Sequence, residues 1–209
     1  MAKEIWFTSD THFGHTEVLD MNSRALNMGI KTVEEHDALI IDLTNKYIKK
    51  EDVLWHLGDY CWKNPGHYRN RINCREMHLC FGNHDKSNYG QQFSTAQNVK
   101  SLKITIPNSD LLTPDERIKI FLSHYPHAIW PSSHHGSMHL YGHCHRMREG
   151  TLNELWPERR SMDVGVDNIF ALLGSYRPIH ISEVFNLLSP RKGHDPVEWY
   201  AVNWGAIKR

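Results

Sequence analysis

The stretch Phe81-Gly82-Asn83-His84-Asp85 places three side chains with useful chemistry next to one another. Asn83 offers an amide oxygen that can hold a metal ion, and His84 offers an imidazole that can transfer a proton near neutral pH. Asp85 offers a carboxylate that can orient a neighbouring group. An apolar run over residues 77–81 precedes them and predicts a buried strand. One such stretch also fits an ordinary polar turn, so its meaning depends on whether the pattern recurs.

The same pattern, an apolar run followed by side chains that can bind metal, recurs along the chain. These positions carry Asp10 and His12, Asp59, Asn83 with His84, His124, and His143 with His145. In an open α/β sheet the carboxyl ends of the strands line one crevice, so we expect these side chains to converge there.

The ligand types limit the metal. Imidazole and carboxylate without a thiolate favour zinc, manganese or iron over an iron–sulfur cluster or a calcium site. With His84 set aside as a proton donor, the remaining candidates are too many for one tetrahedral zinc. They fit two ions that share a bridging carboxylate, about 3.5–4 Å apart.

Short strands and helices must position these residues. Strands are predicted over residues 4–8, 52–57, 77–81, 102–106, 117–122, 137–141, 162–166 and 178–181. Thr32 and Glu35 match a capping box at the start of a helix over residues 33–49. Shorter helices are predicted from Asn64-Pro65 to about residue 72 and over residues 182–188.

The connecting segments are less regular. Residues 17–31 predict a loop or a broken helix over the site, and residues 86–98 carry no clear pattern. A turn is expected at residues 107–110 or 113–116. Residues 190–209 carry no chemical signal, and we expect their aromatic side chains to be packing anchors.

Composition indicates one domain over residues 1–209, without repeats or linkers. Lys plus Arg and Asp plus Glu both number 24, which argues against a nucleic-acid scaffold but leaves a local basic groove open. The four cysteines form no C-x-x-C pair and predict free thiols in a reducing compartment. No signal peptide is present, and no apolar stretch approaches the roughly 18 residues of a membrane span. We therefore expect a soluble, cytoplasmic protein.

The motifs together resemble a known family. In order, Asp10-Thr11-His12, Gly58-Asp59, Gly82-Asn83-His84-Asp85, Ser123-His124 and Gly142-His143-Cys144-His145 are similar to the signature blocks of the calcineurin-like metallophosphoesterases. The blocks span about two-thirds of the chain, and residues 162–167 look like the closing strand of small bacterial and phage members. The motif set is specific for the superfamily and poorly specific for substrate.

The resemblance implies a four-layer α/β/β/α sandwich of two mixed sheets flanked by helices. It implies two divalent ions, with manganese expected first and zinc, iron, nickel or magnesium as alternatives. One ion is expected on Asp10, His12 and His145, and the other on Asn83, His124 and His143, with Asp59 bridging. A hydroxide between the ions is expected to attack phosphorus directly. His84 is expected to protonate the leaving oxygen, and Asp85 to orient His84 or simply to cap the turn.

Three further residues near the motifs have two readings each. His15 is expected either to reach the substrate or to be a solvated loop histidine. Arg24 is expected either to clamp a phosphate with both guanidinium arms or to be a surface arginine. Cys144 lies between two candidate ligands, but alternation of side chains predicts a small buried filler that points away from the metals.

Other polar and aromatic residues are expected to support the site. Asp163 and Asp167 are read as structural, with a hydrogen bond to a ligand histidine as one role. Tyr60, Trp62 and Trp130 are read as core packing, with an aromatic wall for a base as the alternative.

These expectations lead to one functional hypothesis with named rivals. The chain is predicted to hydrolyse a phosphodiester or phosphomonoester of small, nucleotide-like type. A nuclease that acts on DNA or RNA ends and a non-catalytic binding scaffold of the same fold are the alternatives. The presence of His84 favours an enzyme, because some relatives that serve as scaffolds have lost this residue. The physiological substrate and the oligomeric state are not predicted.

Overall fold

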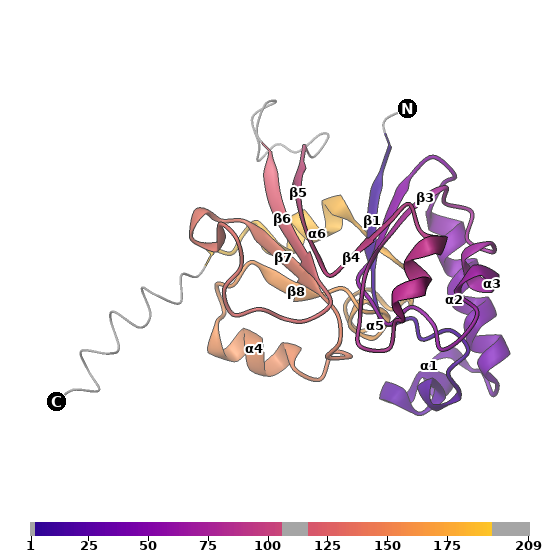
Figure 1. Cartoon of the computed structure of the whole chain (residues 1–209). Helices are drawn as coiled ribbons and strands as arrows, with labels where there is room; N and C mark the ends of the chain where they lie inside the picture. The colour runs from indigo at the N-terminus through magenta and orange to yellow at the C-terminus, as the bar shows by residue number, and fades with distance from the viewer. Residues whose placement is uncertain (1–2, 106–116, 194–209) are drawn as a thin grey trace.

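The first strands of the chain build the larger of two sheets in a computed structural model that describes residues 3–105 and 117–193 (Figure 1). Its strands, in the order β4-β3-β2-β1-β9, are β4 (Thr95–Gln97), β3 (Glu76–Cys80), β2 (Val53–His56), β1 (Ile5–Thr8) and β9 (Ile179–His180). Strands β1 to β4 run parallel, and β9 pairs antiparallel with β1. The residues that follow β1, β2 and β3 therefore emerge at one end of the sheet.

The smaller sheet has the order β5-β6-β7-β8. Its strands are β5 (Val99–Ile104), β6 (Ile118–Ser123), β7 (Met138–Tyr141) and β8 (Ser161–Asp163). Strand β5 is antiparallel to β6, whereas β6, β7 and β8 are parallel. An isolated bridge joins Ser9, after β1, to Gly165, after β8. The two sheets therefore meet at the ends of their parallel strands.

The sheets face each other across a buried apolar cluster. Ile120 and Leu122 of β6, Leu140 of β7 and Phe7 of β1 belong to this cluster. Because side chains alternate along a strand, the residues between them face the opposite side of the smaller sheet. One of these outward residues, Tyr141, donates a hydrogen bond to Glu149 in helix α4 (Glu149–Leu155), which therefore covers that outer face.

Helix α2 (Val33–Tyr47) covers the outer face of the larger sheet. Its capping box is formed: the Thr32 side chain accepts from the Glu35 N–H at 3.2 Å, and the Glu35 carboxylate accepts from the Thr32 N–H at 3.2 Å. Ile40 and Ile41 belong to a second buried cluster that includes Leu54 of β2. The apolar face of the helix thus holds the sheet from outside.

The remaining helices are α1 (Arg24–Met28), α3 (Pro65–Arg69), α5 (Val166–Leu173) and α6 (Ile181–Leu188). Short 3₁₀ segments cover Thr16–Leu19, Met21–Ser23, Ser87–Gln92 and Ser133–His135. Within the described ranges, no helix is long and apolar enough to cross a bilayer.

The predicted α/β sandwich of two mixed sheets flanked by helices is confirmed. The helix over residues 33–49 is confirmed, and residues 17–31 form the expected broken helix. Strand β4 and helix α4 were not predicted, because their residues are mostly polar and carry no clear apolar period. The turn expected at 107–110 or 113–116 lies outside the described residues.

The strand predicted over residues 162–166 is too long. Strand β8 ends at Asp163, and Val166 begins helix α5. Val164 nevertheless donates to the Tyr141 carbonyl at 2.8 Å, and Gly165 forms the bridge to Ser9, so the backbone stays extended between the two elements. This extended path explains why the apolar run resembles one continuous strand.

Candidate metal centre

The loops after β1 and β2 run side by side beyond the end of the larger sheet. The Asp10 N–H donates to the Gly58 carbonyl at 3.0 Å, and the His12 N–H donates to the Asp59 carbonyl at 3.0 Å. Gly82, after β3, lies so close to Asp59 that a Cβ atom there would overlap the Asp59 carboxylate. Glycine is therefore required at that position, and the three loops meet around one carboxylate.

The smaller sheet contributes its histidines through equally close loops. His124 follows β6, and its carbonyl accepts from the Gly142 N–H at 2.9 Å. The His143 N–H donates to both carboxylate oxygens of Asp10, at 3.1 and 3.0 Å. A Cβ atom on Gly142 would overlap Asp10, so glycine is again needed for the approach. These contacts place His124, His143 and His145 opposite the residues of the larger sheet.

Five of the predicted ligands have a backbone in the left-handed region, which residues other than glycine rarely adopt. The φ angles are 58° for Asp10, 49° for His12, 54° for Asp59, 68° for His143 and 44° for His145. Such strain persists where the surrounding structure holds it, and it concentrates at functional sites. The backbone conformation of these loops is therefore consistent with a functional site, although residues such as Asn64 and Ser132 also have a positive φ.

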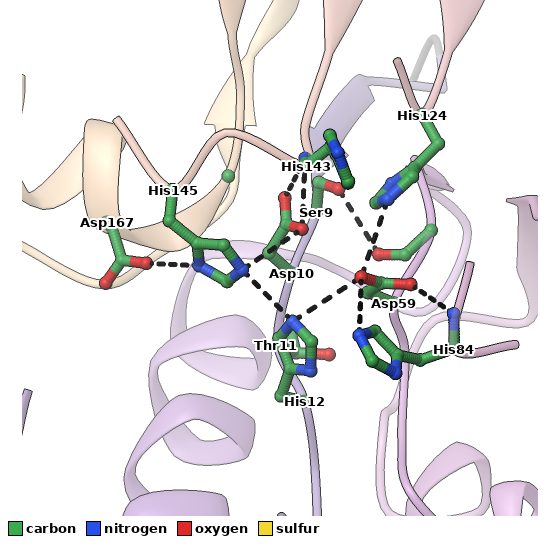
Figure 2. Close-up of polar contacts among 12 residues, drawn as sticks. Ser9, Asp10, Thr11, His12, Asp59, His84, His124, His143, His145 and Asp167 are labelled. Atoms are coloured by element: carbon green, nitrogen blue, oxygen red, sulfur yellow. Dashed lines mark hydrogen bonds and ion pairs between the residues drawn. The ribbon is translucent and has the colours of Figure 1, made fainter. Parts of the chain in front are cut away.

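The first ligand group consists of Asp10, His12 and His145, whose candidate ligand atoms all lie within 4.8 Å of one another (Figure 2). His145 Nδ1 lies 2.8 Å from the Asp167 carboxylate. Its Nε2 lies 3.8 Å from Asp10 Oδ1 and 3.2 Å from His12 Nε2. The Asp167 contact therefore turns the other nitrogen of His145 toward the group.

The second ligand group consists of Asp59, His124 and His143, again with ligand atoms within 4.8 Å of one another. The Asn83 amide oxygen lies 3.1 Å from His124 Nε2 and 3.0 Å from His143 Nδ1. Asp59 Oδ2 lies 3.4 Å from His124 Nε2 and 3.6 Å from His12 Nε2. Asp59 therefore contacts both groups, and the two groups are consistent with a dinuclear site.

The chemistry of these atoms fits a cation. His124 Nδ1 lies 2.7 Å from the Leu57 carbonyl, which can only accept, so the neutral ring carries its lone pair on Nε2. That nitrogen faces the Asp59 carboxylate and the Asn83 oxygen, which are also lone-pair donors. Lone pairs held this close repel one another unless a proton or a metal ion lies between them. The residues present therefore fit divalent ions.

Burial and neighbouring charges shift the pKa values of three of these residues. Burial lowers the pKa of His12 to about 2, so its imidazole stays neutral and keeps a lone pair. Burial opposes charge on His124, but its contact with Asp59 and the charge of Asp10 raise its pKa to about 9. Burial likewise opposes charge on Asp59, yet His124 holds the Asp59 pKa below its usual range. A proton on His124 thus neutralises the charge that a metal ion would neutralise instead.

His84 lies at the rim of this centre. Its side chain is 38% exposed, and its Nε2 lies 4.0 Å from Asp59 Oδ2. The His84 N–H donates to Asp59 Oδ1 at 2.9 Å, which fixes the loop against the same carboxylate. The imidazole ring centroid lies 5.5 Å from those of His12 and Trp62. The ring is therefore next to the ligand groups and open to solvent.

The expectation that Asp85 orients His84 stays a prediction, because the hydrogen bonds seen for Asp85 are with backbone groups. The Asp85 carboxylate accepts three backbone N–H groups, from Gly82 at 2.9 Å, Asp59 at 2.8 Å and Tyr60 at 3.0 Å. These three bonds hold the carboxylate against the backbone of two loops. Asp85 therefore caps the turn and joins the loop after β3 to the loop after β2, as the alternative reading had it.

Both expectations for Arg24 are wrong. Its side chain is fully buried, so it is neither a surface residue nor able to clamp a substrate phosphate. Its Nε and Nη2 each lie 2.7 Å from an oxygen of Asp167, and Nη2 donates to the Asp10 carbonyl at 2.9 Å. Asp167 in turn holds His145, so Arg24 supports the first group from behind. The pairing joins residues far apart in sequence, and no local signal indicates it.

The two supporting aspartates behave differently. The expected hydrogen bond to a ligand histidine is confirmed for Asp167. Asp163 instead accepts from the N–H groups of Gly165 at 2.6 Å and Arg146 at 3.1 Å. Burial and the nearby charge of Asp10 raise the Asp163 pKa to about 8. Cys144 belongs to neither ligand group, and it is half-buried rather than fully buried.

The three aromatic candidates differ in how far they are buried. Tyr60 and Trp130 are buried, as core packing predicts. Trp62 is 41% exposed and stacks on His15, with ring centroids 4.2 Å apart and planes 4° apart. His15 is mostly buried, so it is not a solvated loop residue.

The structure brings all seven predicted metal ligands together, although their roles as ligands stay predictions. They are Asp10, His12, Asp59, Asn83, His124, His143 and His145.

Comparison with known proteins gives distant relatives. No protein-family model matches the chain. It is 27% identical over 189 residues to the Gene 66 protein of Mycobacterium phage L5, and this match covers 78% of this chain and 86% of the phage protein. It is 24% identical over 194 residues to the uncharacterized protein MJ1445 of Methanocaldococcus jannaschii, and this match covers 91% of this chain and 94% of MJ1445.

Solved structures support the fold. AQ665 from Aquifex aeolicus, a protein of unknown function, matches with a TM-score of 0.64 and 24% identity over 89% of this chain and 100% of that one. YfcE, a phosphoesterase from E. coli, matches with a TM-score of 0.36 and 12% identity, which is too distant to support a function. The chain is therefore an α/β sandwich with two groups of His and Asp side chains that could bind metal ions.

Proposed function

We propose that this chain is a two-metal-dependent hydrolase of phosphoester bonds that acts on small, nucleotide-like substrates. The observation that carries the proposal is the meeting of two ligand groups at Asp59, which faces His12 from one group and His124 from the other. A carboxylate so placed can bridge two ions. The half-exposed His84 imidazole at the same carboxylate supplies a proton donor.

The residues that would hold the ions are Asp10, His12 and His145 on one side, Asn83, His124 and His143 on the other, and Asp59 between them. When bound, two divalent ions lower the pKa of a shared water and offset the charge on the phosphoryl oxygens. Asp10 and Asp59 are the carboxylates of this set, so the loaded centre would keep a positive charge. That charge would attract an anionic ester.

His84 would donate a proton to the leaving oxygen. Imidazole can hold and release a proton near neutral pH, and such a donor contributes about 10²–10⁴-fold to a rate. The backbone bond from His84 to Asp59 keeps the ring at the edge of the centre, where a substrate can reach it. His145 and His124 would be held in their ligand tautomers by Asp167 and the Leu57 carbonyl.

A substrate panel tests the proposal. Purified protein loaded with manganese, zinc or magnesium is offered nitrophenyl mono- and diesters, cyclic and linear nucleotides, and single-stranded DNA and RNA ends. We expect hydrolysis of nitrophenyl esters and of a subset of nucleotides, with manganese most active. The matched control is the chain freed of metal by a chelator, which should be inert until an ion is restored.

Other outcomes would contradict the proposal in distinct ways. Cleavage of nucleic-acid ends without turnover of small nucleotides would favour a nuclease. Full metal loading without hydrolysis of any ester would favour a binding scaffold.

A further inference from the structure

An exposed aromatic surface borders the candidate proton donor. Trp62 is 41% exposed as a residue, and its ring stacks on the nearly parallel ring of His15. The ring centroid of His84 lies 5.5 Å from that of Trp62 and 6.3 Å from that of His15. We call the stacked pair of His15 and Trp62 the aromatic shelf.

Trp62 is the exposed member of the shelf, and His15 is mostly buried beside it. The backbone N–H of Trp62 donates to the Phe13 carbonyl at 2.8 Å, and the backbone carbonyl of Trp62 accepts from the Tyr89 hydroxyl at 2.9 Å. His15 Nε2 lies 2.9 Å from the Glu17 carboxylate. These contacts hold the Trp62 backbone and the His15 ring, and the Trp62 ring stacks on the His15 ring. A ligand that stacks there meets a surface already ordered, so little entropy is lost on binding.

The position of the shelf indicates which part of a substrate it meets. In the proposed reaction His84 gives its proton to the leaving oxygen, so the group attached to that oxygen lies on the His84 side of the centre. Trp62, the exposed member of the shelf, has its ring centroid 5.5 Å from that of His84, whereas the His15 centroid lies 5.6 Å from that of His12. Trp62 is therefore the member placed to meet the leaving group.

The chemistry of the shelf favours a nucleobase. A base has two π-faces for stacking, while its polar edges keep their hydrogen bonds to water on an open surface. A purely apolar group would favour an enclosing pocket, which a residue as exposed as Trp62 does not provide. We propose that the aromatic shelf of His15 and Trp62 stacks the base of a nucleoside leaving group, and this inference rests on the proposed function.

The test compares binding of two analogues whose leaving oxygen is replaced by a methylene group, so that neither can be hydrolysed. One is the phosphonate analogue of adenosine monophosphate, and the other is the same analogue of ribose 5-phosphate without a base. Calorimetric titration of manganese-loaded protein gives both affinities. Stacking of one base predicts that the wild type binds the adenosine analogue about 5- to 150-fold more tightly.

Variants locate the effect. Trp62→Ala should bring the affinity ratio close to one, whereas Trp62→Phe should keep most of it, with metal content unchanged in both. Tyr125 is the matched control, because it is 44% exposed and its ring lies 4.7 Å from that of His143, beside the other ligand group. Tyr125→Ala should leave the ratio intact.

The outcomes separate this inference from the proposed function. The proposal of base stacking is overturned if the wild type binds the two analogues with an affinity ratio near one, or if Trp62→Ala leaves that ratio unchanged. This holds even if nitrophenyl esters are hydrolysed. A ratio that depends on Trp62 in a protein that hydrolyses no ester supports base stacking and removes the proposed activity.

Discussion

Histidines gather in two regions of this molecule, and their surroundings differ. The metal-centre histidines follow strand ends: His124 has its Nδ1 against the Leu57 carbonyl, and His145 has its Nδ1 against Asp167. Each therefore turns Nε2 toward an aspartate. The outer histidines, His127 and His139, lie on the outward side of the smaller sheet, where they contact aromatic rings.

Both nitrogens of His139 are used by the backbone. Nδ1 lies 3.1 Å from the Phe121 carbonyl, and Nε2 accepts from the His127 N–H at 3.1 Å. Within residues 3–105 and 117–193, no group of three potential ligands includes either outer histidine. Burial lowers the pKa of His139 to about 3, so it is a neutral packing residue. A metal site therefore requires a free lone pair that faces a carboxylate, and a high density of histidines does not supply it.

The largest expected effect comes from Asp59→Asn. This change removes the carboxylate that both ligand groups share, so we expect loss of at least one bound metal and a fall in activity of more than about 10³-fold. Elemental mass spectrometry measures the bound metal, and turnover of a nitrophenyl diester measures the activity. His139→Gln is the control from the outer region and should keep full metal content. Equal metal content in the two variants would contradict the conclusion that Asp59 binds metal and His139 does not.

His84→Ala should separate proton donation from metal binding. We expect unchanged metal content and a loss of about 10²–10⁴-fold in kcat for esters with alkyl leaving groups. The loss should be smaller for nitrophenyl esters, because nitrophenolate needs little protonation. The ratio of the two losses is the measurement. A similar loss for both classes would exclude His84 as the proton donor.

Arg24→Gln tests the buried support of the metal centre. The change leaves the Asp167 carboxylate in the interior without its guanidinium partner, so we expect the free energy of unfolding to fall by about 3–5 kcal/mol. Urea unfolding of the metal-free protein measures it. The matched control is Arg75→Gln, which breaks an exposed pair with Glu51 and should cost at most about 1 kcal/mol. Equal losses would mean that the Arg24 pair does not stabilise the fold.

The smallest effect is expected in the outer region. Because the folded pKa of His139 is near 3, the unfolded chain takes up a proton below about pH 6.5 that the folded chain refuses. This histidine therefore lowers stability as pH falls from 6.5 toward 3. Between pH 7 and pH 5 the wild type should lose about 2 kcal/mol more than His139→Gln, because glutamine does not titrate. Parallel urea-unfolding series at the two pH values would show the difference, and identical losses would contradict the assignment.

Local patterns in the sequence predicted the parts of the site that depend on neighbours in the chain. The apolar runs before Asp10, Asp59 and His124 are strands β1, β2 and β6. The parallel pairing of β1 with β2 brings the first two strand ends together, and loop contacts bring the end of β6, in the smaller sheet, to them. Arg24 could not be placed, because its partner Asp167 lies 143 residues away and Arg24 itself stands in no recognisable pattern. The sequence did not decide between the two roles of Asp85, because adjacency to His84 does not show which way the side chain turns.

The short apolar run at residues 162–166 shows a second limit. The chain keeps an extended backbone past Asp163 only because Val164 bonds to Tyr141 and Gly165 pairs with Ser9. Both partners belong to other strands or their ends. Periodicity within the run therefore could not separate the strand from the connection to helix α5.

Each ligand group takes residues from both sheets: Asp10 and His12 stand with His145 in one, and Asp59 stands with His124 and His143 in the other. A bound ion would thus cross-link two halves of the molecule that otherwise adhere mainly through apolar packing. Sliding of one sheet against the other would be resisted at the metal end and left freer at the far end. Removal of the metal by a chelator should therefore lower the stability of the whole fold as well as the activity, since ligands that bind only the folded state also stabilise it.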